Sequence, residues 1–143
     1  MKKNIFLNIE KQFRESVEMI LSSSSIIAVY IFGSILRDPS KKEADIDIAF
    51  LLDEKAYKAD PVKSIAPAYL AAAQAGLALN RKTDVTILNG ASLEMAYEII
   101  SSGSCILETD SEKRIVYEIA IRGMFFDFKP FLDQIRSNCI KAI

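Results

Sequence analysis

Residues 26–52 read IIAVYIFGSILRDPSKKEADIDIAFLL, and this stretch decides the fold. It holds two short apolar runs, at 26–32 and 45–52, that are separated by a polar connection. Short runs rich in β-branched and aromatic residues are typical of strands that are buried in a sheet. Gly33 ends the first run, and two aspartates begin the second. The stretch therefore predicts two strands joined by a polar connection, with acidic side chains at one strand end.

Helices and further strands flank this stretch on both sides. Apolar residues at helical spacing predict an amphipathic helix over residues 8–22, and the serines at 22–25 end it. Asp60 followed by Pro61 is a favourable helix start, because Asp caps and Pro gives up an amide that would be unpaired anyway. That helix runs to about residue 79, and a strand at 84–88, a helix at 92–102 and an edge strand at 105–107 follow. The order predicts an α+β domain with a mixed sheet.

The C-terminal part of the chain is predicted to be helical. Thr109 followed by Glu112 has the spacing of a capping box, and Pro130 should kink or break the helix into two segments. Many apolar residues lie around this proline, and we expect most of them to be buried against the sheet of the same chain. An interface with another protein remains an alternative for some of them. They are Ile115, Ile119, Met124, Phe125, Phe126, Phe128, Phe131 and Leu132.

Composition excludes several classes of protein. The chain has 143 residues with 50% hydrophobic content, which predicts one domain over residues 1–143. Eighteen basic residues against 19 acidic ones leave no broad basic field for strong nucleic-acid binding. Cys105 and Cys139 have no paired spacing and are expected to be buried thiols in a reducing compartment. No segment has the length of a membrane span or a signal peptide, so we expect a cytoplasmic protein.

The absence of histidine excludes several kinds of catalytic and metal-binding site. Ser-His-Asp triads, histidine zinc sites and imidazole bases all need a side chain that this chain lacks. Asp45 and Asp47 are two apart on a predicted strand, so both carboxylates project from one face while Ile46 and Ile48 point into the core. Carboxylate oxygens suit Mg²⁺, which completes its shell with water and nucleotide phosphates. Taken alone, the tripeptide also fits a solvated strand end.

Gly33 and Ser34 add a second feature that points to phosphate. A glycine between a buried strand and a short helical turn lets backbone amides approach a phosphate closely, and Ser34 adds a hydroxyl there. The sequence is not a Walker A loop, because no Gly-Lys-Ser/Thr follows. Phosphate charge would then be neutralised by a metal and by Arg37. Taken alone, Gly-Ser is also common in ordinary turns.

The joint pattern is an apolar strand, Gly33-Ser34, ten residues, Asp45-Ile46-Asp47 and a second apolar strand. It resembles the signature of the DNA polymerase β-like nucleotidyltransferase superfamily, which has a palm-like mixed sheet. The resemblance implies that Gly33 and Ser34 hold a nucleoside triphosphate, and that Asp45 and Asp47 bind Mg²⁺. It also implies that Asp84 is the third carboxylate, a metal ligand and the general base. Two positions depart from the common pattern, Asp38 and Ala44, which puts the role of Arg37 in doubt.

The small size of the chain points to one group within this superfamily. The chain is similar to the minimal nucleotidyltransferases, in particular the MntA-type antitoxins of HEPN toxin pairs, over residues of about 24–125. This implies a catalytic core at about 24–108, a helical tail at about 109–143, and two Mg²⁺ ions with ATP as substrate. It further implies AMP transfer to a tyrosine of a HEPN ribonuclease toxin, in a hetero-oligomer with that toxin or as a homodimer. Two alternatives stay open: transfer to a small molecule such as an aminoglycoside, and non-catalytic binding of the toxin.

Overall fold

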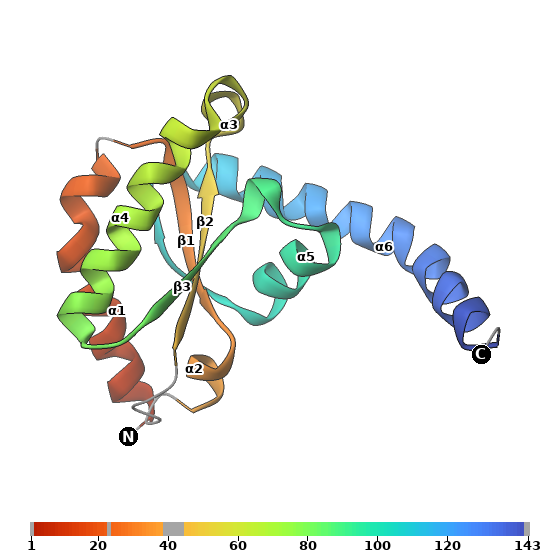
Figure 1. Cartoon of the computed structure of the whole chain (residues 1–143), viewed down its shortest axis with the longest axis horizontal. Coiled ribbons are helices and arrows are strands. Elements are labelled where there is room, and N and C mark those ends of the chain that lie inside the picture. The colour runs from red at the N-terminus through yellow and green to blue at the C-terminus, as the bar shows by residue number, and fades with distance from the viewer. Residues whose placement is uncertain (1, 23, 39–44, 142–143) are drawn as a thin grey trace.

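The computed structural model describes residues 2–22, 24–38 and 45–141 (Figure 1). Part of the polar connection between the first two strands, Ala44 included, lies outside the described residues. The elements in chain order are α1 (Lys2–Ser22), β1 (Ile26–Phe32), α2 (Ser34–Arg37), β2 (Ile46–Leu52), α3 (Glu54–Ala59), α4 (Pro61–Leu79), β3 (Thr83–Ile87), the 3₁₀ turn η1 (Leu88–Gly90), α5 (Leu93–Ser102), β4 (Ser104–Glu108) and α6 (Ser111–Lys141).

The four strands form one mixed sheet in the order β3-β2-β1-β4. β1 pairs antiparallel with both β2 and β4, whereas β2 and β3 run parallel. The predicted mixed sheet is confirmed, and so is the position of β4 at an edge. A parallel pair needs a crossover between its strands, and α4 supplies it.

Helices cover both faces of the sheet. Figure 1 shows α1 and α4 on one side of the strands and α5 with α6 on the other. Side chains alternate along β2, so that Ile48 and Phe50 belong to the first core cluster while Ala49 and Leu51 belong to the second. β1 contributes buried residues to both clusters, as expected for a strand covered on both faces. α4 packs closely because it buries four alanines: Ala68, Ala71, Ala72 and Ala75.

Local capping explains both ends of α4. The Asp60 carboxylate accepts a hydrogen bond from the Lys63 amide at 3.2 Å, and Pro61 is the first residue of α4, as predicted. Asn80 ends α4 in the left-handed conformation at φ 51°. α1 begins at Lys2, earlier than the predicted start at residue 8. The short helix α3, which begins after Asp53, was not predicted.

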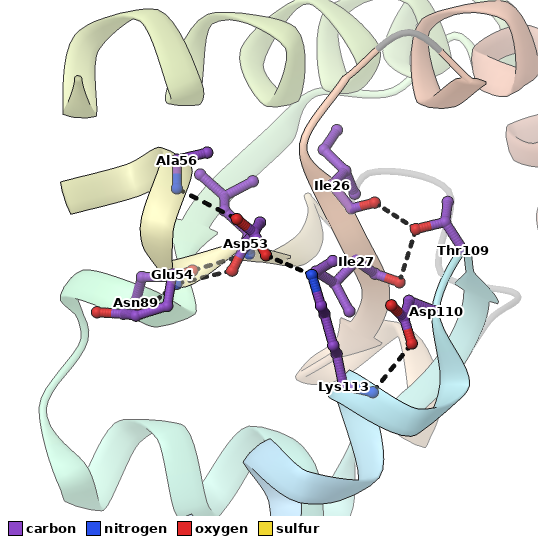
Figure 2. A network of polar contacts seen from close by, with 10 residues as sticks. Ile26, Ile27, Asp53, Glu54, Ala56, Asn89, Thr109, Asp110 and Lys113 are labelled. Carbon is purple, nitrogen blue, oxygen red and sulfur yellow. Dashed lines mark hydrogen bonds and ion pairs between the residues drawn. The ribbon is translucent and has the colours of Figure 1, made fainter. Parts of the chain in front are cut away.

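The predicted capping box at Thr109 is wrong. The Thr109 amide donates to the Ile27 carbonyl at 2.8 Å, and its hydroxyl donates to the Ile26 carbonyl at 2.6 Å, so the residue extends the pairing of β4 with β1 (Figure 2). Asp110 caps α6 in its place, accepting from the Lys113 amide at 3.1 Å. Both residues have capping side chains, and the register of the sheet selects between them.

The break predicted at Pro130 is also wrong, because α6 is one helix of 31 residues with Pro130 inside it. Proline removes the hydrogen bond to the carbonyl of Phe126. Phe126 is exposed, so water can satisfy that carbonyl and the helix continues with a bend that is visible in Figure 1. The predicted burial of the apolar residues around Pro130 is wrong for most of them, since they are exposed.

Two further expectations concern the cysteines and the membrane. Cys105 and Cys139 are free thiols as expected, but both are exposed rather than buried. Cys105 lies on the edge strand β4, and Cys139 lies near the end of α6. Within the described residues, every helix is too short or too polar to cross a membrane.

Candidate active site

The sheet register places two of the predicted carboxylates side by side. Asp47 of β2 is the cross-strand partner of Asp84 on β3, and on its other side it is the partner of Phe32 on β1. Directly opposite residues of neighbouring strands point to the same face of the sheet. Phe32, Asp47 and Asp84 therefore form one row across three strands. This row lies at the end of the sheet from which α2 leaves β1.

Asp45 lies directly before β2, whose first residue is Ile46 rather than the predicted residue 45. The Ile46 amide donates to the Lys82 carbonyl at 2.9 Å, which fixes this strand end beside β3. The negative charge of Asp45 reaches Asp47, because it helps to raise the pKa of that carboxyl. The three aspartates thus occupy one end of two neighbouring strands.

The electrostatics of Asp47 reflect this arrangement. Burial contributes most to the raised pKa of the Asp47 carboxyl, and repulsion from Asp84 and then Asp45 adds to it. A cation at this place would relieve both the repulsion and the cost of burial. The carboxylates are therefore held in an arrangement that favours a positive ligand.

Gly33 brings the backbone against Asp47. Its φ of 80° and ψ of −150° lie in a region that is essentially restricted to glycine. A Cβ at this position would collide with the Asp47 carboxylate, so only glycine fits for steric reasons as well. The Gly33 carbonyl accepts from the Leu36 amide at 3.2 Å, which starts the turn of α2.

Ser34 and Arg37 begin and end α2. Residues three apart on a helix share a side, so the Ser34 hydroxyl and the Arg37 guanidinium project in similar directions. The buried Ile35 anchors this short helix in the core. Ser34 is half-buried and Arg37 is exposed, so both are reachable by a ligand from solvent. Their binding roles remain predictions.

The donor set fits Mg²⁺ only as part of a ternary site. Among the described residues, no group of three or more His, Cys, Asp or Glu side chains is arranged to hold a metal ion by itself. Mg²⁺ is usually bound through one or two carboxylates together with water and substrate phosphates. Asp45, Asp47 and Asp84 therefore suit an ion that arrives with a nucleotide, rather than one that is resident in the free protein.

Phe32 also belongs to this row, although no sequence motif marks it. Its half-buried ring stands next to Asp47 in the cross-strand row, and a Cβ on Gly103 would lie 3.3 Å from its Cβ. The connection between α5 and β4 thus packs against it. Its position next to the carboxylates follows from the register of β1 with β2, which the sequence pattern leaves open.

Comparison with known proteins gives one family match and several similar folds. The family model described as polymerase beta, nucleotidyltransferase, matches residues 15–112. No curated protein matches the chain. Among solved structures, a chain of a toxin–antitoxin crystal structure with AMP-PNP has a TM-score of 0.61 at 18% identity, covering 98% of this chain and 99% of that chain.

Two further solved structures are similar. A chain of the toxin–antitoxin MntA–HepT has a TM-score of 0.61 at 16% identity, over 90% of this chain and 97% of that one. A chain from the complex of a tri-AMPylated Shewanella oneidensis HEPN toxin with an MNT antitoxin has a TM-score of 0.59 at 19% identity, over 98% and 99%. At these identities the likeness is one of fold, and it extends over nearly the whole chain.

Proposed function

The chain belongs to the polymerase beta nucleotidyltransferase family, and from this premise we propose that it is an antitoxin that transfers AMP from ATP to a tyrosine of a cognate HEPN ribonuclease toxin. The modification would block the ribonuclease. The two exposed free thiols fit the reducing cytoplasm in which we place this reaction.

The observation that carries the proposal is the fold match along the whole chain. Chains from toxin–antitoxin complexes, one with AMP-PNP and one with a tri-AMPylated HEPN toxin, match over 98% of this chain and 99% of their own length. The match thus includes α6 as well as the catalytic core. The adjacent Asp47 and Asp84 add independent support, because a catalytic site of this family requires carboxylates that lie together.

Each residue of the site has a proposed role. The backbone at Gly33 and the Ser34 hydroxyl bind the triphosphate, with Arg37 on the same side of α2. Asp45, Asp47 and Asp84 would hold two Mg²⁺ ions together with that triphosphate. When bound, Mg²⁺ neutralises phosphate charge and lowers the pKa of the acceptor hydroxyl.

Asp84 is also the proposed general base. It accepts the proton of the tyrosine hydroxyl while the phenolic oxygen attacks the α-phosphorus and pyrophosphate leaves. Its carboxylate is exposed, so an acceptor from another protein can reach it.

The test combines the purified chain with α-labelled ATP, Mg²⁺ and its cognate HEPN protein. We expect label on the HEPN protein and loss of its ribonuclease activity. An Asp45→Asn/Asp47→Asn double variant should lose both effects by a factor of at least about 100, since two of the three proposed metal ligands are gone. Asp60→Asn is the matched control, because Asn preserves the cap of α4 and this residue lies far from the row.

Three outcomes would contradict the proposal. No label on the HEPN protein with the wild-type chain would exclude AMP transfer to it. Label on an aminoglycoside in its place would favour a small-molecule acceptor. A double variant that still neutralises the toxin would favour inhibition by binding alone.

A further inference from the structure

α6 carries most of the exposed apolar surface in the described part of the chain. Fifteen large hydrophobic residues are exposed among the described residues of the chain, and nine of them belong to α6. Figure 1 shows the C-terminal part of this helix projecting away from the sheet. Single exposed hydrophobic residues are ordinary on a protein surface, but a concentration on one projecting helix marks an interaction site.

Four of these residues form a regular line, which we call the outer stripe. Met124, Phe128, Phe131 and Ile135 follow one another at spacings of four, three and four residues, the spacing of a helix-packing seam. Their exposed fractions lie between 42% and 55%.

The outer stripe continues a helix-packing seam whose inner residues are packed within the fold. Going back along α6 by three and then four residues leads to Ile121 and Tyr117, which pack in the second core cluster. The inner part of the seam is covered by the sheet and α5, while the outer part has the same apolar character without a cover. An apolar stripe of this kind is normally covered along its whole length.

Two contacts fix the direction in which the outer stripe faces. The ring of Phe125 stacks on Tyr97 of α5, with centroids 3.8 Å apart and planes 6° from parallel. Further out, Arg136 forms an ion pair with Glu94 of α5 at 2.7 Å. α5 thus holds the neighbouring side of α6. Between the two helices, Leu93, Met124 and Phe128, together with Asp127, line a shallow and mostly apolar hollow into which an apolar side chain could insert.

The outer stripe and the candidate active site lie on the same side of the sheet. Asp47 alternates with Ile46 and Ile48 along β2, so it points to the face of Ala49 and Leu51. That face is the one that α5 and α6 cover, with Ile121 in the same cluster as Ala49. A protein seated on the outer stripe would therefore lie on the same side of the sheet as the carboxylate row.

We propose that the outer stripe is the docking surface for the acceptor protein of the AMP transfer, the HEPN partner, and that an apolar segment of this partner covers it. The inference rests on the proposed function. The occupant is favoured by two observations. Asp84 is exposed and needs an acceptor from outside the chain. A similar chain from the complex with a HEPN toxin matches 98% of this chain, α6 included.

The test uses a Phe128→Glu/Phe131→Glu variant of the full chain. Both side chains are exposed, so the fold should be retained, which circular dichroism and thermal unfolding verify. We expect the Kd for the HEPN protein to rise at least about 10-fold, as for apolar anchors at other interfaces. The Kd for Mg²⁺–ATP should be unchanged. The matched control is Val62→Glu/Leu77→Glu, which places the same charges at exposed apolar positions of α4, on the other face of the sheet.

AMP transfer gives a second readout that a purely structural role would not produce. The stripe variant should show a raised KM for the HEPN protein with kcat preserved at saturation, because docking is weakened while the chemistry is intact. An unchanged Kd for the HEPN protein would overturn the inference. So would a wild-type chain that is dimeric alone and becomes monomeric in the stripe variant, since the stripe would then join two copies.

The proposed function can fail separately. If the wild-type chain binds the HEPN protein through the stripe but transfers no AMP, the docking surface is supported and the proposed AMP transfer is contradicted. If label transfer is equal in the wild type and the stripe variant at limiting HEPN protein, the proposed AMP transfer is supported and the docking surface is contradicted.

Discussion

At the scale of single residues, the candidate site depends on one close approach. Gly33 places its backbone against the Asp47 carboxylate, and Asp47 in turn lies beside Asp84. The raised pKa of Asp47, caused by burial and then by the other two carboxylates, shows that this cluster carries an electrostatic cost in the free protein. A backbone conformation that only glycine adopts readily and a crowded carboxylate are both features of the kind that are found at functional sites.

Gly33→Ala should destabilise the protein and abolish nucleotide binding. For a residue with a Cβ, the backbone conformation at position 33 alone costs about 1–3 kcal/mol. The added methyl group would also displace the Asp47 carboxylate. Urea unfolding and titration with Mg²⁺–ATP measure the two effects. Gly123→Ala is the matched control: nothing lies within 4 Å of the added Cβ, and alanine in a helix should stabilise by up to about 1 kcal/mol. A Gly33→Ala protein that binds Mg²⁺–ATP normally would contradict the proposed phosphate site.

At the scale of elements, the end of the sheet opposite to the site is held by polar contacts between segments distant in sequence (Figure 2). Asp53 accepts from the Ala56 amide at 3.2 Å to cap α3, and its other oxygen bonds Lys113 of α6 at 2.7 Å. Asn89 donates to the Leu52 carbonyl and accepts from the Leu52 amide, both at 2.8 Å. These contacts fasten α3 and η1 to β2, and the start of α6 to the same strand end.

Asp53→Ala should lower the free energy of unfolding by about 1 kcal/mol at pH 7, mainly through loss of the cap. The hydrogen bond from Lys113 and then that from Ala56 lower the pKa of Asp53 below its ordinary value of 3.8. The stability that the ionised carboxylate adds is therefore present above pH 3.8 and is lost as the pH falls below it. The difference between wild type and variant should shrink in denaturant titrations at pH 3.

Asp53→Asn separates the two contributions. Asn keeps the cap and removes the ion pair with Lys113, so its effect should be smaller than that of Ala, as expected for an exposed pair. An equal difference between wild type and Asp53→Ala at pH 3 and pH 7 would show that ionisation of Asp53 adds nothing.

At the scale of the whole molecule, α6 has two parts with different support. Its first turns are fixed by Arg114, which bonds both Glu108 of β4 and the buried Glu118, and by Ile121 in the second core cluster. Beyond Met124 the helix is supported on one side only, by Tyr97 and Glu94 of α5. The stability of a segment follows the burial that it gains, so the outer part should open more readily.

Hydrogen exchange should therefore be faster in α6 after residue 124 than before residue 122 in the chain alone. Adding the HEPN protein should slow exchange in the outer part, because docking covers the outer stripe. Mass spectrometry of peptic peptides measures both. Uniform protection along α6 without a partner would mean that the outer half has a cover within the chain or in a second copy.

The sequence by itself determined the four strands and most of the helices around them, and it predicted Gly33, Ser34, Asp45, Asp47 and Asp84 as residues of the candidate site. β1, α4 and the Gly33-Ser34 turn were predictable because the signals are local: β-branched runs, an Asp-Pro helix start and a glycine at a strand end. The pairing of Asp47 with Asp84, the choice of Asp110 over Thr109 as the cap of α6, and the exposure of its outer stripe were decided by the tertiary structure. The physical reason is that strand register and helix cover depend on contacts between distant segments, whereas caps and periodicity depend on neighbours in sequence.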